Sequence, residues 1–147
     1  MKKIIKFGVL AAVLVLVSGC GGSKGKVLKC TLSESEDNMN VNMTIKVNYD
    51  EEKATKATIE NDVKFGKELK DYADELKESY DEQFEELADK EGVEYTSSAK
   101  DGKVNYKVSI DVNKISEEVL KDMHMSDLNK TYEETKAALE KDGYSCK

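Results

Sequence analysis

Apolar and polar residues alternate along several segments of the chain. The clearest segment runs from Met39 to Tyr49, where every odd position is apolar and every even position is polar. This period-two pattern is typical of a β-strand buried on one face. It also predicts strands over 27–35, 54–65 and 104–112, with a short, weaker strand at 93–95. Because the turns between the first three strands are short, we expect an antiparallel meander that can present one face to water.

A different spacing marks residues 66–91, where apolar side chains recur at intervals of three and four. This spacing predicts a long amphipathic helix with an acidic outer surface, and Gly92 is expected to end it. Two shorter helices are predicted further on. Ser116 is expected to cap the first, and Thr131 opens the second, where Glu134 completes a capping box.

These elements indicate one α+β domain over residues 27–147. We expect an antiparallel β-sheet meander with the long amphipathic helix and the two shorter C-terminal helices packed on one face. The composition points the other way, because Leu, Ile, Val and Phe make up only 18% of residues 20–147, whose net charge is −10. Such a composition is common in disordered chains. We expect a folded domain because both periodicities are clean, with a core thin enough to need further support.

The charge pattern excludes some partners. The chain contains Lys but no Arg, and its acidic surface suits neither a phosphate backbone nor anionic lipid headgroups. Nucleic-acid binding is therefore not expected. The use of Lys without Arg also suggests a low-G+C, Gram-positive host.

The N-terminus has the features of an export signal. Residues 1–6 are basic, and residues 7–17 form an apolar run that is too short for a comfortable transmembrane helix. The sequence Leu16-Val17-Ser18-Gly19-Cys20 resembles the bacterial lipobox. The resemblance implies that residues 1–19 are a lipoprotein signal peptide and that Cys20 carries diacylglycerol. An ordinary secretory signal is the alternative.

A lipid at Cys20 would hold the protein on the extracytoplasmic face of the cell membrane, because two acyl chains anchor stably where one does not. Residues 20–26 would comprise the anchor and a flexible tether rich in Gly and Ser.

Cysteines occur at positions 20, 30 and 146. If Cys20 is lipidated, Cys30 and Cys146 remain as one pair at the two ends of the domain, and we expect a disulfide in an oxidising exterior. The bridge would close a loop of more than 100 residues and contribute about 4–5 kcal/mol in the chain-entropy model. Two free thiols, or a redox or metal role, are the alternatives, although neither cysteine lies in a Cys-x-x-Cys motif.

Two short motifs support a family resemblance. The predicted domain opens with Cys30-Thr31-Leu32, and the chain ends with Gly143-Tyr144-Ser145-Cys146 before the last lysine. Together with the lipobox, the alternating strand and the acidic helix, these motifs resemble the YehR-like lipoproteins, a bacterial family of small exported domains of unknown function. The likeness covers most of residues 27–147. It implies an α+β fold and a lipid anchor, and it implies no catalytic residue.

Candidate chemistry is sparse. The single histidine, His124, lies between Met123 and Met125, and these are ligand types that suit Cu(I). Consecutive helical residues point in different directions, however, so the three side chains do not converge. The acidic run Glu82, Glu85, Glu86 and Asp89 is best interpreted as a solvated helix face. We expect no enzyme activity, no cofactor, no metal site and no catalytic residue.

The function expected from the sequence is a membrane-anchored, non-catalytic domain that binds an unknown protein or small-molecule partner at the cell envelope. The alternative is a metal-handling protein, for copper or another cation, or a hydrolytic envelope protein. The polar face of the sheet is the predicted contact surface. Its residues are Asn40, Asn42, Thr44, Lys46, Asn105, Lys107, Ser109 and Asp111.

Overall fold

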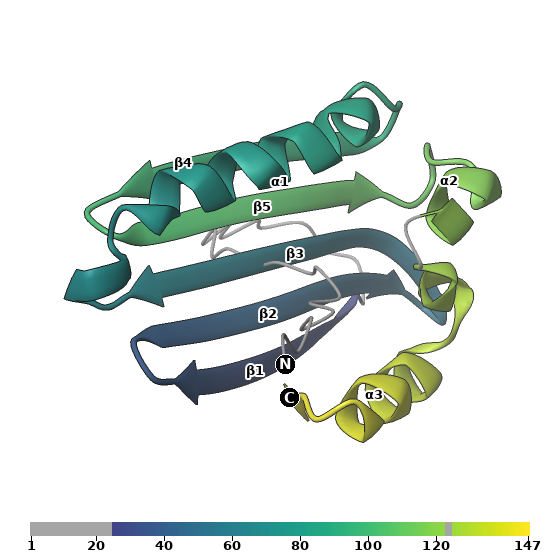
Figure 1. The fold of residues 1–147 in the computed structure, drawn as a ribbon. Helices are drawn as coiled ribbons and strands as arrows, with labels where there is room; N and C mark the ends of the chain where they lie inside the picture. The colour runs from purple at the N-terminus through teal and green to yellow at the C-terminus, as the bar shows by residue number, and fades with distance from the viewer. Residues whose placement is uncertain (1–24, 123–124) are drawn as a thin grey trace.

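The computed structural model describes residues 25–122 and 125–147 and places them in one α+β domain. Within this part of the chain, a six-stranded antiparallel sheet is combined with three α-helices, the longest of which lies over one face of the sheet (Figure 1). The predicted signal peptide, Cys20 and His124 lie outside the described residues. The elements are β1 (Lys26–Glu36), β2 (Met39–Asp50), β3 (Lys53–Phe65), α1 (Tyr72–Ala88), β4 (Val93–Lys100), β5 (Lys103–Asp111), α2 (Glu117–Asp122), α3 (Tyr132–Lys141) and β6 (Ser145–Cys146), with short 3₁₀ turns at Lys67–Leu69 and Ser126–Asn129.

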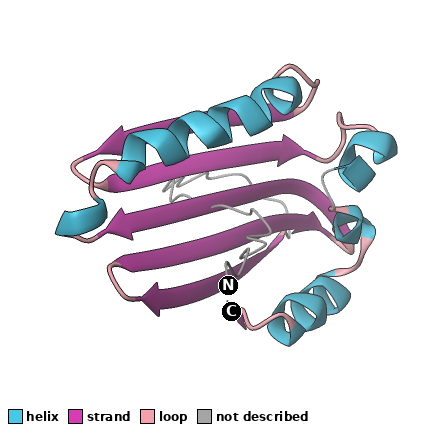
Figure 2. Cartoon of the chain, in the orientation of Figure 1, coloured by secondary structure: helices cyan, strands magenta, loops and turns pink. Residues whose placement is uncertain are grey.

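The strand order is β4-β5-β3-β2-β1-β6 (Figure 2). The first three strands form the expected meander. The later strands do not continue it in chain order, because β5 lies between β3 and β4 and pairs antiparallel with both. The helix α1 connects β3 to the edge strand β4. It lies over β4 and β5 and runs along them (Figure 1).

The tight turns follow the local sequence. The β1–β2 turn places Asn38 at φ 68°, and the β4–β5 turn places Asp101 and Gly102 at φ 53° and 73°. Asn, Asp and Gly tolerate this left-handed region better than other residues do. The hairpin predicted at Asp101-Gly102 is therefore present.

The long helix is shorter than the sequence pattern predicts. It begins at Tyr72 rather than near residue 66, because the chain before it is held in extended and 3₁₀ conformations. The N–H of Gly66 donates to the carbonyl of Asn38 (2.7 Å), and the N–H of Phe65 donates to that of Gly102 (2.8 Å). These bonds tie the end of β3 to two hairpin turns. The helix ends at Ala88, so Gly92, at φ 86°, lies in the turn before β4 rather than at the cap.

The strand β4 is longer than the predicted 93–95. It pairs with β5 along its whole length, from Val93 opposite Ile110 to Lys100 opposite Lys103. Its polar residues gave a weak strand signal, and the pairing with β5 determines its extent.

The core lies between the sheet and the helices. The odd residues of β2 and the even residues of β5 are buried, as the alternation predicts. Tyr80 and Phe84 of α1 pack on Tyr106 and Tyr95, with ring centroids 4.3 Å apart for Tyr80–Tyr106 and 5.0 Å for Phe84–Tyr95. Among the described residues, the buried cluster extends from Leu28 to Leu128.

The C-terminal segment returns to the sheet as expected. Thr131 and Glu134 form the predicted capping box of α3, and Gly143 follows the helix at φ 94°. The last strand, β6, pairs with β1 so that Cys146 lies opposite Cys30, and the structure joins the two in a disulfide. The bridge spans 116 residues, so in the chain-entropy model it removes about 4–5 kcal/mol of unfolded-state freedom.

Candidate functional site

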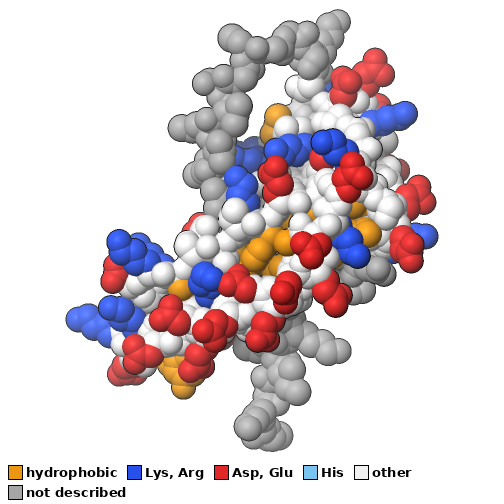
Figure 3. All heavy atoms as spheres, turned by 90° about the horizontal axis from the view of Figure 1, so that it is seen from above, with side chains coloured by type: hydrophobic (Ala, Val, Ile, Leu, Met, Phe, Trp, Pro, Cys, Tyr) orange, Lys and Arg blue, Asp and Glu red, His pale blue; other side chains and the backbone are white. Residues whose placement is uncertain are grey.

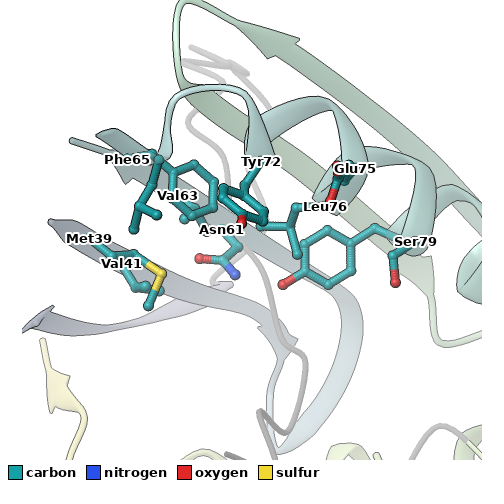
Figure 4. Close-up of a pocket in the computed structure, with 11 residues that line it drawn as sticks. Met39, Val41, Asn61, Val63, Phe65, Tyr72, Glu75, Leu76 and Ser79 are labelled. Atoms are coloured by element: carbon teal, nitrogen blue, oxygen red, sulfur yellow. The ribbon is translucent and has the colours of Figure 1, made fainter. Parts of the chain in front are cut away.

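A cavity of about 480 Å³ opens between α1 and the helix-facing side of β2 and β3 (Figure 4). It exists because α1 packs mainly on β4 and β5 through its aromatic residues, which leaves the ends of β2 and β3 less covered. Its volume falls within the range of small-molecule sites, about 300–1,000 Å³. The lining residues are Met39, Val41, Asn61, Val63, Phe65, Leu69, Tyr72, Glu75, Leu76, Ser79 and Tyr80.

Most of the cavity wall is apolar, and Asn61 brings a polar group to it from the sheet. Asn61 is only 3% exposed, and its Oδ1 accepts no hydrogen bond from any described residue. The hydroxyl of Tyr106, which lies opposite Asn61 on β5, is buried and interacts with the side chains of Asn61 and Tyr80. A buried polar atom without a hydrogen-bond partner costs about 1–3 kcal/mol. The Oδ1 of Asn61 is such an atom among the described residues, and it can accept a hydrogen bond from a ligand.

The tyrosines of this region are neutral at physiological pH. Burial raises the pKa of Tyr80 and of Tyr106 above the ordinary tyrosine value. Their hydroxyls can donate or accept a hydrogen bond, and neither supplies a charge. The inner part of the cavity is thus polar at a few atoms and uncharged.

The mouth of the cavity is marked by Tyr72, which is 55% exposed and lies at the first turn of α1. Among the lining residues, all in the described part of the chain, only Glu75 is charged. Figure 4 shows Glu75 on the outer side of α1. Acidic side chains gather along one side of the molecule, beside a patch of hydrophobic ones (Figure 3).

Asp81 fixes the position of α1 over the cavity through hydrogen bonds to β4. Its carboxylate accepts hydrogen bonds from Lys77, from Ser97 and from the hydroxyl of Tyr95 (3.0 Å). Partial burial alone would raise the pKa of Asp81, but these three hydrogen bonds lower it below its ordinary value. Asp81 therefore stays ionised and pins α1 to β4.

The cavity lies at the end of the sheet far from Lys26, the first residue of β1. Lys26, the first residue of β1, pairs with Tyr49, whereas Met39 of the cavity pairs with Glu36 at the far end of the same strand. The eleven residues of β1 span about 35 Å at roughly 3.3 Å per residue. The chain therefore enters the sheet at Lys26, far from the cavity.

The eight residues of the predicted contact surface share the sheet face opposite the helices. They come from the even positions of β2 and the odd positions of β5, as the sequence predicts. Ser109 is the correction, because it is only 4% exposed and offers little to a partner.

Several polar groups of this face already bond to one another. Ser33 donates to Oδ1 of Asn42 (2.8 Å), Ser35 donates to Oδ1 of Asn40 (2.7 Å), and Nδ2 of Asn105 donates to Oδ1 of Asp62 (2.7 Å). Such ladders between strands order the side chains of the face.

The sequence analysis missed Glu60 at the centre of this face. Glu60 lies opposite Thr44 on one side and Lys107 on the other, and it is 3% exposed. Burial raises its pKa to about 7, against the opposing attraction of Lys46, Lys107 and Lys29. The local sequence does not mark Glu60, because it occupies a polar position of the alternating pattern like any solvent-facing residue. Its cross-strand neighbours come from distant segments of the chain.

Among the described residues, no three His, Cys, Asp or Glu side chains are grouped so that they could hold a metal ion. Met125 of the copper alternative is buried in the core, and Met123 and His124 lie outside the described residues. The acidic run from Glu82 to Asp89 has exposed glutamates, as expected for a solvated face. None of the described helices has the length and apolar character needed to cross a bilayer.

Two solved structures share this fold. An NMR structure of the Escherichia coli YehR protein is 16% identical, covers 86% of this chain and 93% of its own, and gives a TM-score of 0.57. An NMR structure of a protein from Streptococcus pneumoniae TIGR4 is 15% identical, covers 95% of this chain and 94% of its own, and gives a TM-score of 0.55. The chain therefore has a YehR-like fold. Neither a family model nor a curated protein matches it.

Proposed function

We propose that this chain is a lipid-anchored, non-catalytic binding domain of the bacterial cell envelope and a member of the YehR-like lipoproteins. The lipobox at Cys20, the Cys-Thr-Leu opening and the Gly-Tyr-Ser-Cys ending support membership. The similarity in fold to the E. coli YehR protein supports it further.

The cavity beneath α1 is the observation that carries the binding function. It combines an apolar wall, one buried carboxamide whose Oδ1 accepts no hydrogen bond from the described residues, and an exposed tyrosine at its mouth. A largely apolar pocket with a few polar groups is the usual form of a small-molecule site. Its neutral interior supports binding rather than acid–base catalysis, because the carboxyl with a pKa of about 7, Glu60, lies on the other face of the sheet.

The anchor and the cavity fit one arrangement. Lipid at Cys20 would place the Lys26 end of the sheet toward the membrane, and the cavity would then face away from it. A ligand would reach the cavity from the aqueous side of the envelope. Metabolic labelling with a clickable fatty acid tests the anchor, since Cys20→Ala should lose the label that the parent protein takes up.

A titration with N-phenyl-1-naphthylamine, an uncharged apolar probe that fluoresces in apolar sites, tests the cavity. The exported domain without the lipid should raise the fluorescence of the probe, and this increase should saturate as the site fills. Leu76→Trp should fill the cavity and weaken binding at least tenfold. Leu87→Trp alters another half-buried leucine of α1 that does not line the cavity and should bind like the parent. A parent domain that leaves the fluorescence unchanged would refute the proposed site.

A second candidate is partner binding on the open face, which the cluster of Glu60, Lys46 and Lys107 favours. The double reversal Lys46→Glu with Lys107→Glu should then weaken recovery of a cross-linked partner, and it should also lower thermal stability at neutral pH because it replaces two lysines near Glu60 with acids. The matched reversal Glu82→Lys with Glu86→Lys on the helix should not weaken it. The opposite pattern would move the partner site to the acidic helix.

A further inference from the structure

We infer that the ligand of this cavity is an uncharged amphiphile, with a hydrocarbon part against the apolar walls and one neutral hydrogen-bonding group, a primary amide or an alcohol, against Asn61. This inference rests on the proposed binding function and names the chemical class that the site would take. Three features of the cavity carry it, namely its apolar walls, the Oδ1 of Asn61 that accepts no hydrogen bond from the described residues, and its charge.

The walls are suited to a flexible hydrocarbon. Met39, Phe65 and Leu76 are half-buried, so a ligand that covers them removes further apolar surface from water. Methionine has an unbranched, adaptable side chain that fits irregular ligand shapes. The gain is proportional to the apolar area removed from water, and it needs no particular head group.

The polar end is determined by Asn61. Its Oδ1 is buried, lines the cavity and accepts no hydrogen bond from the described residues. A ligand N–H or O–H at hydrogen-bond distance would satisfy it. A carboxamide both donates and accepts, so a primary amide or a hydroxyl group on the ligand complements it in either orientation.

The charge of the surroundings excludes ionised head groups. A carboxylate or phosphate would meet the acidic helix α1, from which Glu75 lines the cavity. An ammonium group would be buried against a neutral amide, with no carboxylate among the inner lining residues. An ion without a partner is costly to desolvate, whereas a neutral amide or alcohol is not.

Competition against bound N-phenyl-1-naphthylamine tests the ligand class with four compounds that share one ten-carbon chain: decanamide, decan-1-ol, decanoate and decylammonium. At pH 7.5 the amide and the alcohol should displace the probe at concentrations at least tenfold lower than the two ions. Equal or tighter binding of decanoate or decylammonium would overturn the ligand class while leaving the binding site intact. Absence of probe binding to the parent domain would instead overturn the proposed function itself.

Two matched variants test the role of Asn61. Asn61→Leu keeps the approximate size of the side chain and removes the amide. The dissociation constant of decanamide, divided by that of the naphthylamine probe, should therefore rise at least fivefold. Asn48→Leu makes the same change at an exposed position of β2 and should leave the ratio unchanged. A ratio that does not rise in Asn61→Leu would contradict the hydrogen bond to Asn61.

Discussion

Asn61 and Glu60 are consecutive residues of β3 that point to opposite faces of the sheet, and both are buried with an oxygen that lacks a hydrogen-bond partner in the described residues. Asn61 left a trace in the sequence, because it is the polar residue in phase with the apolar Ala57, Ile59 and Val63. A polar residue at a core-facing position is informative. Glu60 left no such trace.

The buried Oδ1 of Asn61 accepts no hydrogen bond from the described residues, and it should make the free domain less stable than it could be. Replacement of Asn61 by Leu removes this oxygen, so the free energy of unfolding without ligand should rise by about 1 kcal/mol. Urea unfolding of the domain that comprises residues 25–147 measures it. A loss of stability would mean that Asn61 is satisfied in the free protein and does not await a ligand. Substitutions at functional sites commonly raise the stability of a protein while they weaken its ligand binding.

Glu60 should give the domain a pH-dependent stability. Its pKa is raised from 4.5 to about 7 in the folded state, so the folded state binds more protons than the unfolded state between these values. The free energy of unfolding should therefore fall as the pH rises from about 4.5 to about 7 and change little above that. Glu60→Gln should flatten this slope, with a difference on the order of 1 kcal/mol at pH 8, because water and three lysines moderate the cost.

Urea unfolding at pH 5 and pH 8 measures this effect. The exposed Glu94 of β4 provides the matched control, and Glu94→Gln should keep the slope of the parent domain. An unchanged slope in Glu60→Gln would contradict the burial of this carboxyl.

At the scale of elements, the sequence predicted what is determined locally. The strands β1, β2, β3 and β5, the capping box at Thr131 and the turn at Asp101-Gly102 all follow from neighbouring residues. The start of α1 and the length of β4 could not be predicted, because the bond from Gly66 to Asn38 and the pairing of β4 with β5 join distant segments. The cavity depends on where α1 rests, and that position depends on Asp81, Tyr95 and Ser97 together.

The C-terminal elements should depend on the disulfide. Cys30→Ala with Cys146→Ala should lower the free energy of unfolding by about 2–5 kcal/mol, because β6 is only two residues long and the bridge restricts the unfolded chain. Urea unfolding measures the loss, and parent domain in reductant should show a loss of similar size. Equal stability with and without the bridge would contradict the support that it gives to a thin core.

At the scale of the whole molecule, the sheet separates two surfaces and two ends. One face holds the helices and the cavity, and the other holds the lysines around Glu60. Lys26 enters at one end of β1, and the cavity lies at the other. The sequence predicted which residues share each face from their alternation. It could not predict that the helix-covered face would hold the cavity, because partial coverage of β2 and β3 is a property of the assembled layers.

The central claim is that the cavity beneath α1, rather than the open face, binds the ligand. Titration of the ¹⁵N-labelled domain that comprises residues 25–147 with N-phenyl-1-naphthylamine, followed by NMR, tests it most directly. The account predicts chemical-shift changes concentrated at Asn61, Val63, Leu76 and Ser79, with Asn42 and Lys107 unaffected. Changes concentrated at Asn42 and Lys107, with the cavity residues unmoved, would contradict it.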